Sequence, residues 1–586
     1  MRNQFRPIIA CILLGAQTPA SHAQNSDNLP TTAESAALVE LLSDYQADRR
    51  AVRSFYSMSF DERSYDRLAE VDASAKRALE TTDFDALDQQ GRIDYLLFRT
   101  ELEARAAELE LQRQRLEEMR ELIPFAEAIA ALERDRVAMK PIDAQAAAVL
   151  LDGIDEQVEA LRKRIDKGRK EGEADDDRLV VSAVLANRAS RTVRNLARTL
   201  NHWYGEYNGY KPGFGWWVSS PFADAHEALN DYADFLGRTV AGVQGRDDDP
   251  LIGDPIGREK LLTDLRTEWI PYSPEELIAI ADREFAWCEA EMLRASRELG
   301  FGDDWHAALD AVKQDHAEPG EQDTLVAELA QEAIDYVTDN DLVTVPPLVA
   351  ELWRLEMIPP RDQRVYPFAF YGGNYMGVSY PTDEMGHEDK LMSMRGNNRH
   401  FTRAIVHHEL VPGHHLQGFI AQRERSYRGA FRTPFLVEGW CLYWEMVLYD
   451  RGFPRTPQER IGMLFWRMHR CARIIVSLKF HLGEMSPEEM IAFLVDRVGH
   501  ERSGATGEVR RFIGGDYSPL YQAAYMLGGL QLRALKAELV GTDRMTEREF
   551  HDTVLRHNSI PVELIRAGMT DQPLDRETRP GWRFGD

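Results

Sequence analysis

The chain has 586 residues, of which 44% are hydrophobic and 28% charged, a balance typical of a folded protein with a large core. Its formal net charge of -27 argues against a nucleic-acid partner, because nucleic-acid binding depends largely on neutralising phosphates with Lys and Arg. Beyond the first residues, no apolar run approaches the roughly 18 residues of a membrane-spanning helix, so no membrane span is predicted.

The first 23 residues have the pattern of a secretory signal peptide. Arg2 and Arg6 give a positive start, an apolar stretch follows over residues 7–16, and Ala23 ends a run of small residues. We expect cleavage after Ala23 and a periplasmic or secreted mature protein. The residues before Cys11 are similar to a lipoprotein box, but too few apolar residues precede it, so we favour cleavage without lipidation.

The mature chain is predicted to be mainly α-helical. Segments such as 101–120 are dense in Ala, Leu, Glu and Arg, with apolar residues at helical spacing. The best strand candidate is 365–380, which is rich in aromatic residues and glycine and predicts a small hairpin or extended edge. An acidic segment at 247–250 divides the chain into an N-terminal helical half, 24–245, and a C-terminal helical half, 246–586. The two halves could also form one continuous domain.

Three segments of the C-terminal half have the sequence of a helix capping box. In this motif a Ser or Thr side chain and a Glu three residues later each accept a hydrogen bond from the other residue's backbone. The boxes begin at Ser273, Ser486 and Thr546, and the first two have proline at the first helical position. Helices are therefore expected to begin directly after these three residues.

Four of the 16 histidines lie within nine residues, in the segment His407-His408-Glu409-Leu410-Val411-Pro412-Gly413-His414-His415. The usual zinc-peptidase motif places two histidines four residues apart on one helix, with Glu beside the first. Here Pro412 stands four residues after His408, and an unbroken helix would separate His408 from His415 by about 10 Å. Zinc requires both nitrogens at about 2.0–2.1 Å, so chelation requires a break in the helix.

Pro412-Gly413 can supply this break, because proline removes a backbone donor and glycine permits unusual backbone angles. The chain could then return His414 to the metal, so we predict that His408 and His414 bind zinc. The adjacent His407 and His415 remain alternatives, either as ligands or as hydrogen-bonding residues around the metal. An ordinary helix end is the other interpretation, but it leaves the flanking histidines without a common explanation.

Phe435–Tyr449 is apolar nearly all round and predicts a buried helix that begins after Thr433. It carries Glu438 and Glu445, two turns apart on one face. A buried carboxylate is costly unless it is paired or bound to a metal. Glu438 is therefore predicted to be the third zinc ligand, and Glu445 is predicted to accept a hydrogen bond that orients a ligand histidine.

These motifs resemble the bacterial family called domain of unknown function 885. The resemblance rests on His408-Glu409, Pro412-Gly413-His414-His415 and Glu438-Gly439-Trp440, and on the later segment Tyr521-Gln522-Ala523-Ala524-Tyr525. That family is similar to the helical zinc peptidases of the thimet oligopeptidase and carboxypeptidase Taq group, although its His-Glu motif is two residues longer. The resemblance implies a large helical zincin-like body with a cleft, in which Glu438 completes the zinc site.

In this interpretation Glu409 is the general base that takes a proton from the attacking water. The charge that develops on the substrate carbonyl needs a donor besides zinc, and Tyr525 takes this role by family likeness. Tyr521 and His500 are further candidates near the substrate. Three arginines recur at three-residue spacing, at Arg467, Arg470 and Arg473. They could bind a substrate carboxylate or form structural salt bridges instead.

Together these patterns predict an exported zinc-dependent hydrolase that acts on a peptide or small amide substrate. Two other functions are compatible with the same residues: a metal-dependent hydrolase of non-peptide amides or esters, and a non-catalytic binding protein with a vestigial site. The sequence contains no Gly-x-Ser-x-Gly elbow and no phosphate-binding loop, so serine-hydrolase and nucleotide-dependent functions have no local support.

Overall fold

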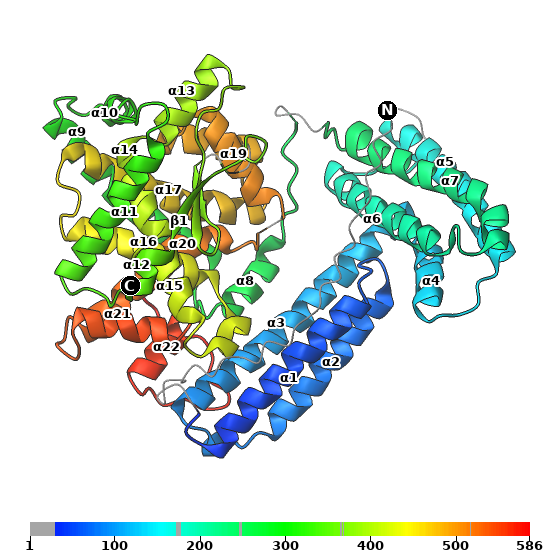
Figure 1. Cartoon of the computed structure of the whole chain (residues 1–586), viewed down its shortest axis with the longest axis horizontal. Coiled ribbons are helices and arrows are strands. Elements are labelled where there is room, and N and C mark those ends of the chain that lie inside the picture. Colours follow the sequence, from blue (N-terminus) through cyan, green and yellow to red (C-terminus); the bar gives the residue numbers. More distant parts are fainter. Residues whose placement is uncertain are drawn as a thin grey trace, which may run out of the picture.

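The computed structural model describes residues 30–170, 177–244, 249–363, 366, 368–515 and 517–585. The predicted signal peptide lies outside these residues, as does part of the acidic segment at 247–250. The chain folds mainly into α-helices with one small sheet, as predicted (Figure 1). Among the described residues, none of the helices is both long enough and apolar enough to cross a membrane.

The N-terminal helices form an arm that projects from the rest of the molecule (Figure 1). Their bounds are α1 (Ala33–Phe55), α2 (Glu62–Thr81), α3 (Gln89–Met119), α4 (Ala126–Val137), α5 (Ala144–Arg169), α6 (Ala183–Tyr207) and α7 (Pro212–Asp234), followed by the π-helical segment η4 (Phe235–Val240). Helices α1, α2 and α3 run side by side, and α4 to α7 continue the arm beyond the end of α3.

The remaining helices form a compact body, in which α9, α18 and α21 begin at the three predicted capping boxes. The bounds are α8 (Gly257–Thr267), α9 (Pro274–Glu298), α10 (Trp305–Lys313), α11 (Gln322–Asp339), α12 (Pro347–Leu352), α13 (His387–Gly396), α14 (Arg399–Glu409), α15 (His414–Ala421), α16 (Pro434–Asp450), α17 (Pro457–His481), α18 (Pro487–Phe493), α19 (Arg502–Ile513), α20 (Tyr521–Leu539), α21 (Glu547–Arg556) and α22 (Val562–Met569).

The sheet has three strands in the order β1-β3-β2. Strands β2 (Ala369–Tyr371) and β3 (Tyr375–Val378) pair antiparallel as a hairpin inside the segment predicted to be extended. Strand β1 (Arg354–Met357) adds a parallel partner to β3 that the sequence pattern did not predict. Strand β2 also contacts α14, so the hairpin lies beside the helix that carries the first histidine pair.

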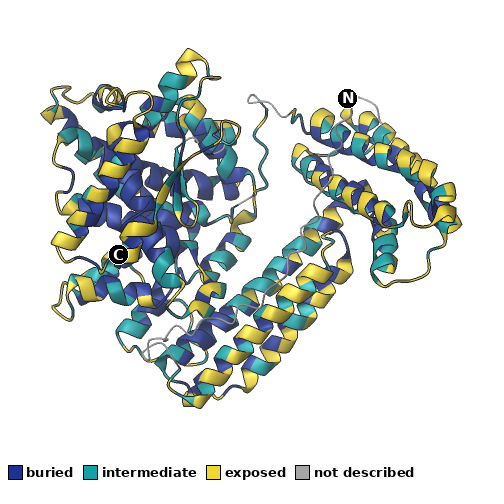
Figure 2. Ribbon diagram, viewed as in Figure 1, coloured by how far each residue is buried: buried dark blue, intermediate teal, exposed yellow. Residues whose placement is uncertain are grey.

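Two hydrophobic cores divide the described residues, and α3 belongs to both. Its residues Ile93 to Leu102 pack into the core of the body, whereas Leu109 and the residues after it pack with α4 to α7. Figure 2 shows the buried centre of the body and the narrower buried seam of the arm. One continuous helix therefore connects the two cores.

Helix α16 is buried along almost its whole length, as the sequence predicts. It crosses α20 where glycine faces glycine: a Cβ on Gly528 would lie 1.8 Å from the carbonyl oxygen of Phe435, and one on Gly439 would lie 2.5 Å from the Cα of Gly528. Only residues without a side chain permit this approach. The crossing brings Glu438 within hydrogen-bonding reach of Tyr521.

Gly528→Ala is expected to destabilise the protein by about 1–3 kcal/mol, the usual cost of overpacking, because the added methyl would overlap the Phe435 carbonyl. Gly205→Ala is the matched control, since Gly205 lies within α6 and an added Cβ there would have no atom within 4 Å. Alanine should be neutral or stabilising there. Urea unfolding followed by circular dichroism measures both variants, and equal stabilities would contradict the close crossing.

Candidate metal centre

The predicted break between the two histidine pairs is present. Helix α14 ends at Glu409 and α15 begins at His414. Gly413 lies against the end of α14: its N–H donates to the His407 carbonyl at 3.0 Å, and a Cβ would lie 1.7 Å from the His408 carbonyl oxygen. The indole N–H of Trp440 donates to the carbonyl oxygen of Pro412 at 2.8 Å, which ties the reversal to α16.

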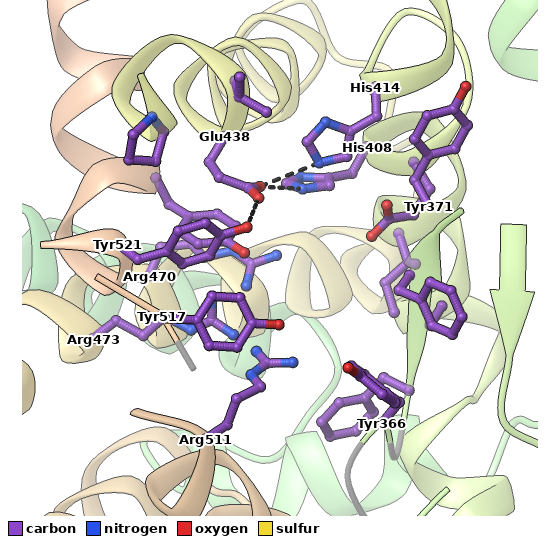
Figure 3. A pocket seen from close by; sticks show the side chains of 18 of the residues that line it. Tyr366, Tyr371, His408, His414, Glu438, Arg470, Arg473, Arg511, Tyr517 and Tyr521 are labelled. Carbon is purple, nitrogen blue, oxygen red and sulfur yellow. Dashed lines mark hydrogen bonds and ion pairs between the residues drawn. The ribbon is translucent and has the colours of Figure 1, made fainter. Parts of the chain in front are cut away.

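This reversal brings the rings of His408 and His414 together edge to face, with centroids 5.1 Å apart and planes inclined by 81°. Their Nε2 atoms converge on one oxygen of α16: Oε2 of Glu438 lies 3.5 Å from His408 Nε2 and 3.2 Å from His414 Nε2 (Figure 3). All three side chains are largely buried. Three helices therefore bring the three predicted ligands together.

The arrangement fits a small divalent cation. In a tetrahedral site with metal–ligand distances of about 2.0–2.2 Å, neighbouring ligand atoms lie roughly 3.3–3.6 Å apart. The two distances from Glu438 Oε2 are close to this spacing. Glu438 Oε2 is also buried, and among the described residues it is paired with these two Nε2 atoms alone. Two imidazoles and a carboxylate are a donor set that zinc accepts.

Cys441 competes with Glu438 for the third ligand position, since ligand atoms of His408, His414 and Cys441 all lie within 4.8 Å of one another. However, the Cys441 thiol donates to the Val437 carbonyl of its own helix, 3.5 Å away, and does not line the adjacent cavity, whereas Glu438 does. Burial and the nearby carboxylates raise the pKa of this thiol well above its usual value. Glu438 therefore fits the position better.

Glu445 holds His408 in place, because its Oε1 accepts a hydrogen bond from His408 Nδ1 at 2.7 Å. This contact fixes the imidazole tautomer and leaves Nε2 directed at Glu438. Burial lowers the pKa of His408, but the hydrogen bonds to Glu438 and Glu445 outweigh burial and raise it to about 9. Burial raises the pKa of Glu438, but His414 and His408 outweigh it and hold that pKa well below its usual value. The cluster thus stabilises positive charge at this point.

The centre lies at one end of a cavity of about 590 Å³. Glu409 also lines this cavity, directly after the first ligand histidine in the chain. The hairpin contributes Phe370 and Tyr371 to the wall, and α20 contributes Tyr521 and Tyr525. Figure 3 shows Tyr371 on the side opposite Tyr521, with the His–Glu cluster between them.

The two tyrosines of α20 contact the centre in different ways. The hydroxyl of Tyr521 donates to Oε1 of Glu438. The ring of Tyr525 stacks on that of His408, with centroids 6.1 Å apart and planes inclined by 19°. Burial, followed by the charge of Glu438, raises the pKa of Tyr525 to about 12, so its hydroxyl is protonated at neutral pH and able to donate a hydrogen bond.

Three histidines singled out by the sequence lie outside this cavity. His407 is buried against Phe453, and burial lowers its pKa to about 4. His415 is held between the Tyr371 hydroxyl at 3.1 Å and the Val349 carbonyl at 3.0 Å. His500 lies behind the cavity wall, where its Nε2 is 2.9 Å from Nδ1 of His469.

Arginines line the other end of the cavity. Arg473 lines the cavity, and its Nη2 donates to Glu508 at 2.7 Å, so it forms one of the salt bridges that the sequence left as the alternative to substrate binding. Arg467 does not line the cavity, because it pairs with Glu284 at 2.9 Å and packs over Trp287. Arg511 also lines the cavity but was not predicted, because its local sequence carries no sign of a site.

A second cavity of about 1120 Å³ lies between the arm and the body. It is lined by residues of α3 and α6 on one side and by 512–515 and 517–520 on the other. Tyr517 and Ser518 line both cavities. The space around the candidate metal centre therefore borders a groove whose far wall is the arm.

Comparison with known proteins gives a family and a fold. A family model described as "Bacterial protein of unknown function (DUF885)" matches residues 48–569. A candidate lipoprotein of unknown function from Shewanella oneidensis has 17% identity and a TM-score of 0.65, with 92% of this chain and 99% of that chain covered. A candidate lipoprotein from Colwellia psychrerythraea has 16% identity and a TM-score of 0.58, with the same coverage. Curated proteins gave no match.

Gly413→Ala is expected to weaken Zn²⁺ binding by about tenfold or more, because the added methyl would push α15 away from the His408 carbonyl and separate the histidines. Gly418→Ala is the control, since its nearest neighbour to an added Cβ, the Tyr371 ring, is 3.9 Å away. Competition with a chromophoric chelator measures the affinity. A folded Gly413→Ala protein with unchanged affinity would show that the reversal does not form the site.

Proposed function

Since this chain belongs to the bacterial DUF885 family, whose description assigns no function, we propose from its own site that it is a zinc-dependent hydrolase of peptide or other small amide bonds. The observation that carries this proposal is the convergence of two histidine Nε2 atoms on Oε2 of Glu438, at 3.5 and 3.2 Å. The cavity beside them also contains an acid, Glu409, and a protonated phenol, Tyr525.

In this proposal His408, His414 and Glu438 hold one zinc ion. When bound, zinc would activate water at neutral pH and polarise the carbonyl of the substrate. Glu445 keeps His408 in its tautomer through the hydrogen bond at Nδ1. Tyr521 binds Oε1 of Glu438, which leaves Oε2 directed at the two histidines.

The catalytic groups follow from their places around the cavity. Glu409 acts as general base: its carboxylate takes a proton from water and passes it to the leaving nitrogen of the amide. Tyr525 donates its hydroxyl hydrogen to the carbonyl oxygen as negative charge develops there. The Tyr525 ring stacks on the His408 ring, so this donor stands beside a proposed zinc ligand.

We also propose a distant relation to the helical zinc peptidases of the thimet oligopeptidase and carboxypeptidase Taq group. The order of the ligands supports it: two histidines around a Glu, then a Glu on the next buried helix. Export is a further part of the proposal. It is supported by the signal-like residues 1–23 and by similarity to two structures described as candidate lipoproteins.

Elemental analysis of the purified mature protein is expected to find one zinc ion per chain. Glu438→Ala and His414→Ala each remove a ligand atom and should reduce the zinc content to background. Cys441→Ala should retain zinc, because the thiol hydrogen-bonds within its own helix. Zinc retained by Glu438→Ala and lost from Cys441→Ala would instead identify the thiol as the third ligand.

Glu409→Gln should retain zinc but lower kcat by about 10²–10⁴-fold, since the amide cannot accept a proton from water. The assay uses a panel of short peptides, N-acyl amino acids, other amides and esters, with zinc content measured on the same samples. Loss of zinc from this variant would make Glu409 a ligand. Turnover of esters or non-peptide amides alone would favour a different hydrolase, and zinc-loaded protein inactive on the whole panel would favour a binding protein.

A further inference from the structure

One wall of the cavity, which extends from beside Tyr525 to the end away from the histidines, carries an excess of positive charge. Arg470 and Arg473 of α17 and Arg511 of α19 line it. In Figure 3 they lie on the same side as Tyr517 and Tyr521, and Arg511 lies at the end away from the histidines. Glu508 pairs with two members of this group, Arg473 and Arg511, and Arg470 forms no ion pair with any residue that the structure describes.

Arg470 is a buried cation that no described carboxylate contacts, although the charges of Glu445 and Glu438 act on it from beyond ion-pair distance. It is 7% exposed, its Nε is buried without a partner, and it forms no ion pair with any residue that the structure describes. Its guanidinium lies over the rings of Trp466 and Tyr525, with centroid distances of 5.3 and 4.5 Å. Aromatic faces offset only part of the cost of removing this charge from water. The Arg470 guanidinium lines the cavity and is therefore suited to bind an anionic group of a ligand.

Arg473 and Arg511 are held in position but keep free donors. Glu508 accepts from Arg473 Nη2 at 2.7 Å and pairs with Arg511 Nη2 at 3.1 Å. Arg473 Nε also donates to His469 at 2.9 Å. Nη1 of Arg473 and Nε of Arg511 have no partner among the described residues. Arg473 and Arg511 are therefore held in place by the protein, and their positive charge is only partly neutralised. This local positive charge contrasts with the net charge of -27 of the chain.

We propose that Arg470, Arg473 and Arg511 bind a carboxylate of the substrate, which restricts the enzyme to short peptides or N-acyl amino acids with a free C-terminal carboxylate near the scissile amide. This inference rests on the proposed hydrolase function and names its substrate class. Guanidinium groups match the planar carboxylate with paired hydrogen bonds. With a volume of about 590 Å³ in all, the cavity suits a small molecule rather than a folded chain.

Binding can be tested without turnover. Isothermal titration calorimetry of the zinc-loaded mature protein compares N-benzoylglycine with N-benzoylglycinamide, which lacks the carboxylate charge. The acid should bind at least about tenfold more tightly, and Arg470→Gln should remove this preference, as expected for hydrogen bonds to a charged group. Equal affinity for both probes, or binding of inorganic phosphate but not of the acid, would overturn the proposal.

Two further variants guard against a folding defect in Arg470→Gln. Arg511→Gln removes a more exposed member of the same cluster and should also weaken binding of the acid. Arg502→Gln removes an equal charge from α19 at a surface pair with Glu488 and should change nothing. If folded Arg470→Gln and Arg511→Gln both bind the acid like the unmodified protein, the arginines are not the subsite.

Kinetics separate this inference from the function on which it rests. N-acyl dipeptides are compared as free acids and as C-terminal amides, and Arg470→Gln should raise KM for the acids by about tenfold or more while leaving the amides unchanged. Equal turnover of acids and amides would keep the hydrolase and overturn the carboxylate subsite. Arg470-dependent binding of N-benzoylglycine by a protein that hydrolyses nothing would keep the subsite and overturn the hydrolase.

Discussion

The contact of Gly413 with the last turn of α14 is the constraint on which the candidate centre depends. Without it, His408 and His414 would continue along one helix and point in different directions. With it, the two ring centroids lie 5.1 Å apart and both Nε2 atoms approach Oε2 of Glu438. The glycine crossing of α16 and α20 does the same for the opposite wall, because it lets Tyr521 reach Glu438. The site is therefore assembled by backbones that pack closely at these glycines, which brings its side chains within reach of one another.

The two ends of the cavity have opposite electrostatic preferences. Carboxylates around His408 stabilise positive charge, whereas the guanidinium groups around Arg470 stabilise negative charge. A ligand that carries a polar carbonyl at one end and an anion at the other would be oriented before any reaction. Tyr525 lies between the two groups, with its ring centroid 4.5 Å from the Arg470 guanidinium and 6.1 Å from that of the His408 ring. This polarity supports a small, polar substrate more strongly than the chemistry of the metal ligands alone.

Features that depend on neighbouring residues could be predicted from the sequence. The capping boxes start helices α9, α18 and α21, the Pro412-Gly413 break is present, and the buried helix α16 lies where its apolar residues predict. Features that depend on contacts between distant segments could not. Both histidine pairs flank the same break, so only tertiary packing decides that His407 turns towards Phe453. Arg511 reaches the cavity on a helix whose sequence carries no sign of the site, and β1 pairs with β3 across an intervening segment that includes β2.

The sharing of α3 between two cores has a mechanical consequence. Helix α3 is unbroken and packs into a core at each end. The arm is therefore joined to the body through a rigid helix and cannot rotate freely about it. The packing of Ile93 to Leu102 in the body sets the orientation of the arm. A small rotation of α3 at this end would produce a larger displacement at the other end, towards α4 to α7. The groove between arm and body thus has a width fixed by side-chain packing rather than by a linker. Substitutions among Ile93 to Leu102 would therefore change the width of this groove beside Tyr517, although they lie far from it in the chain.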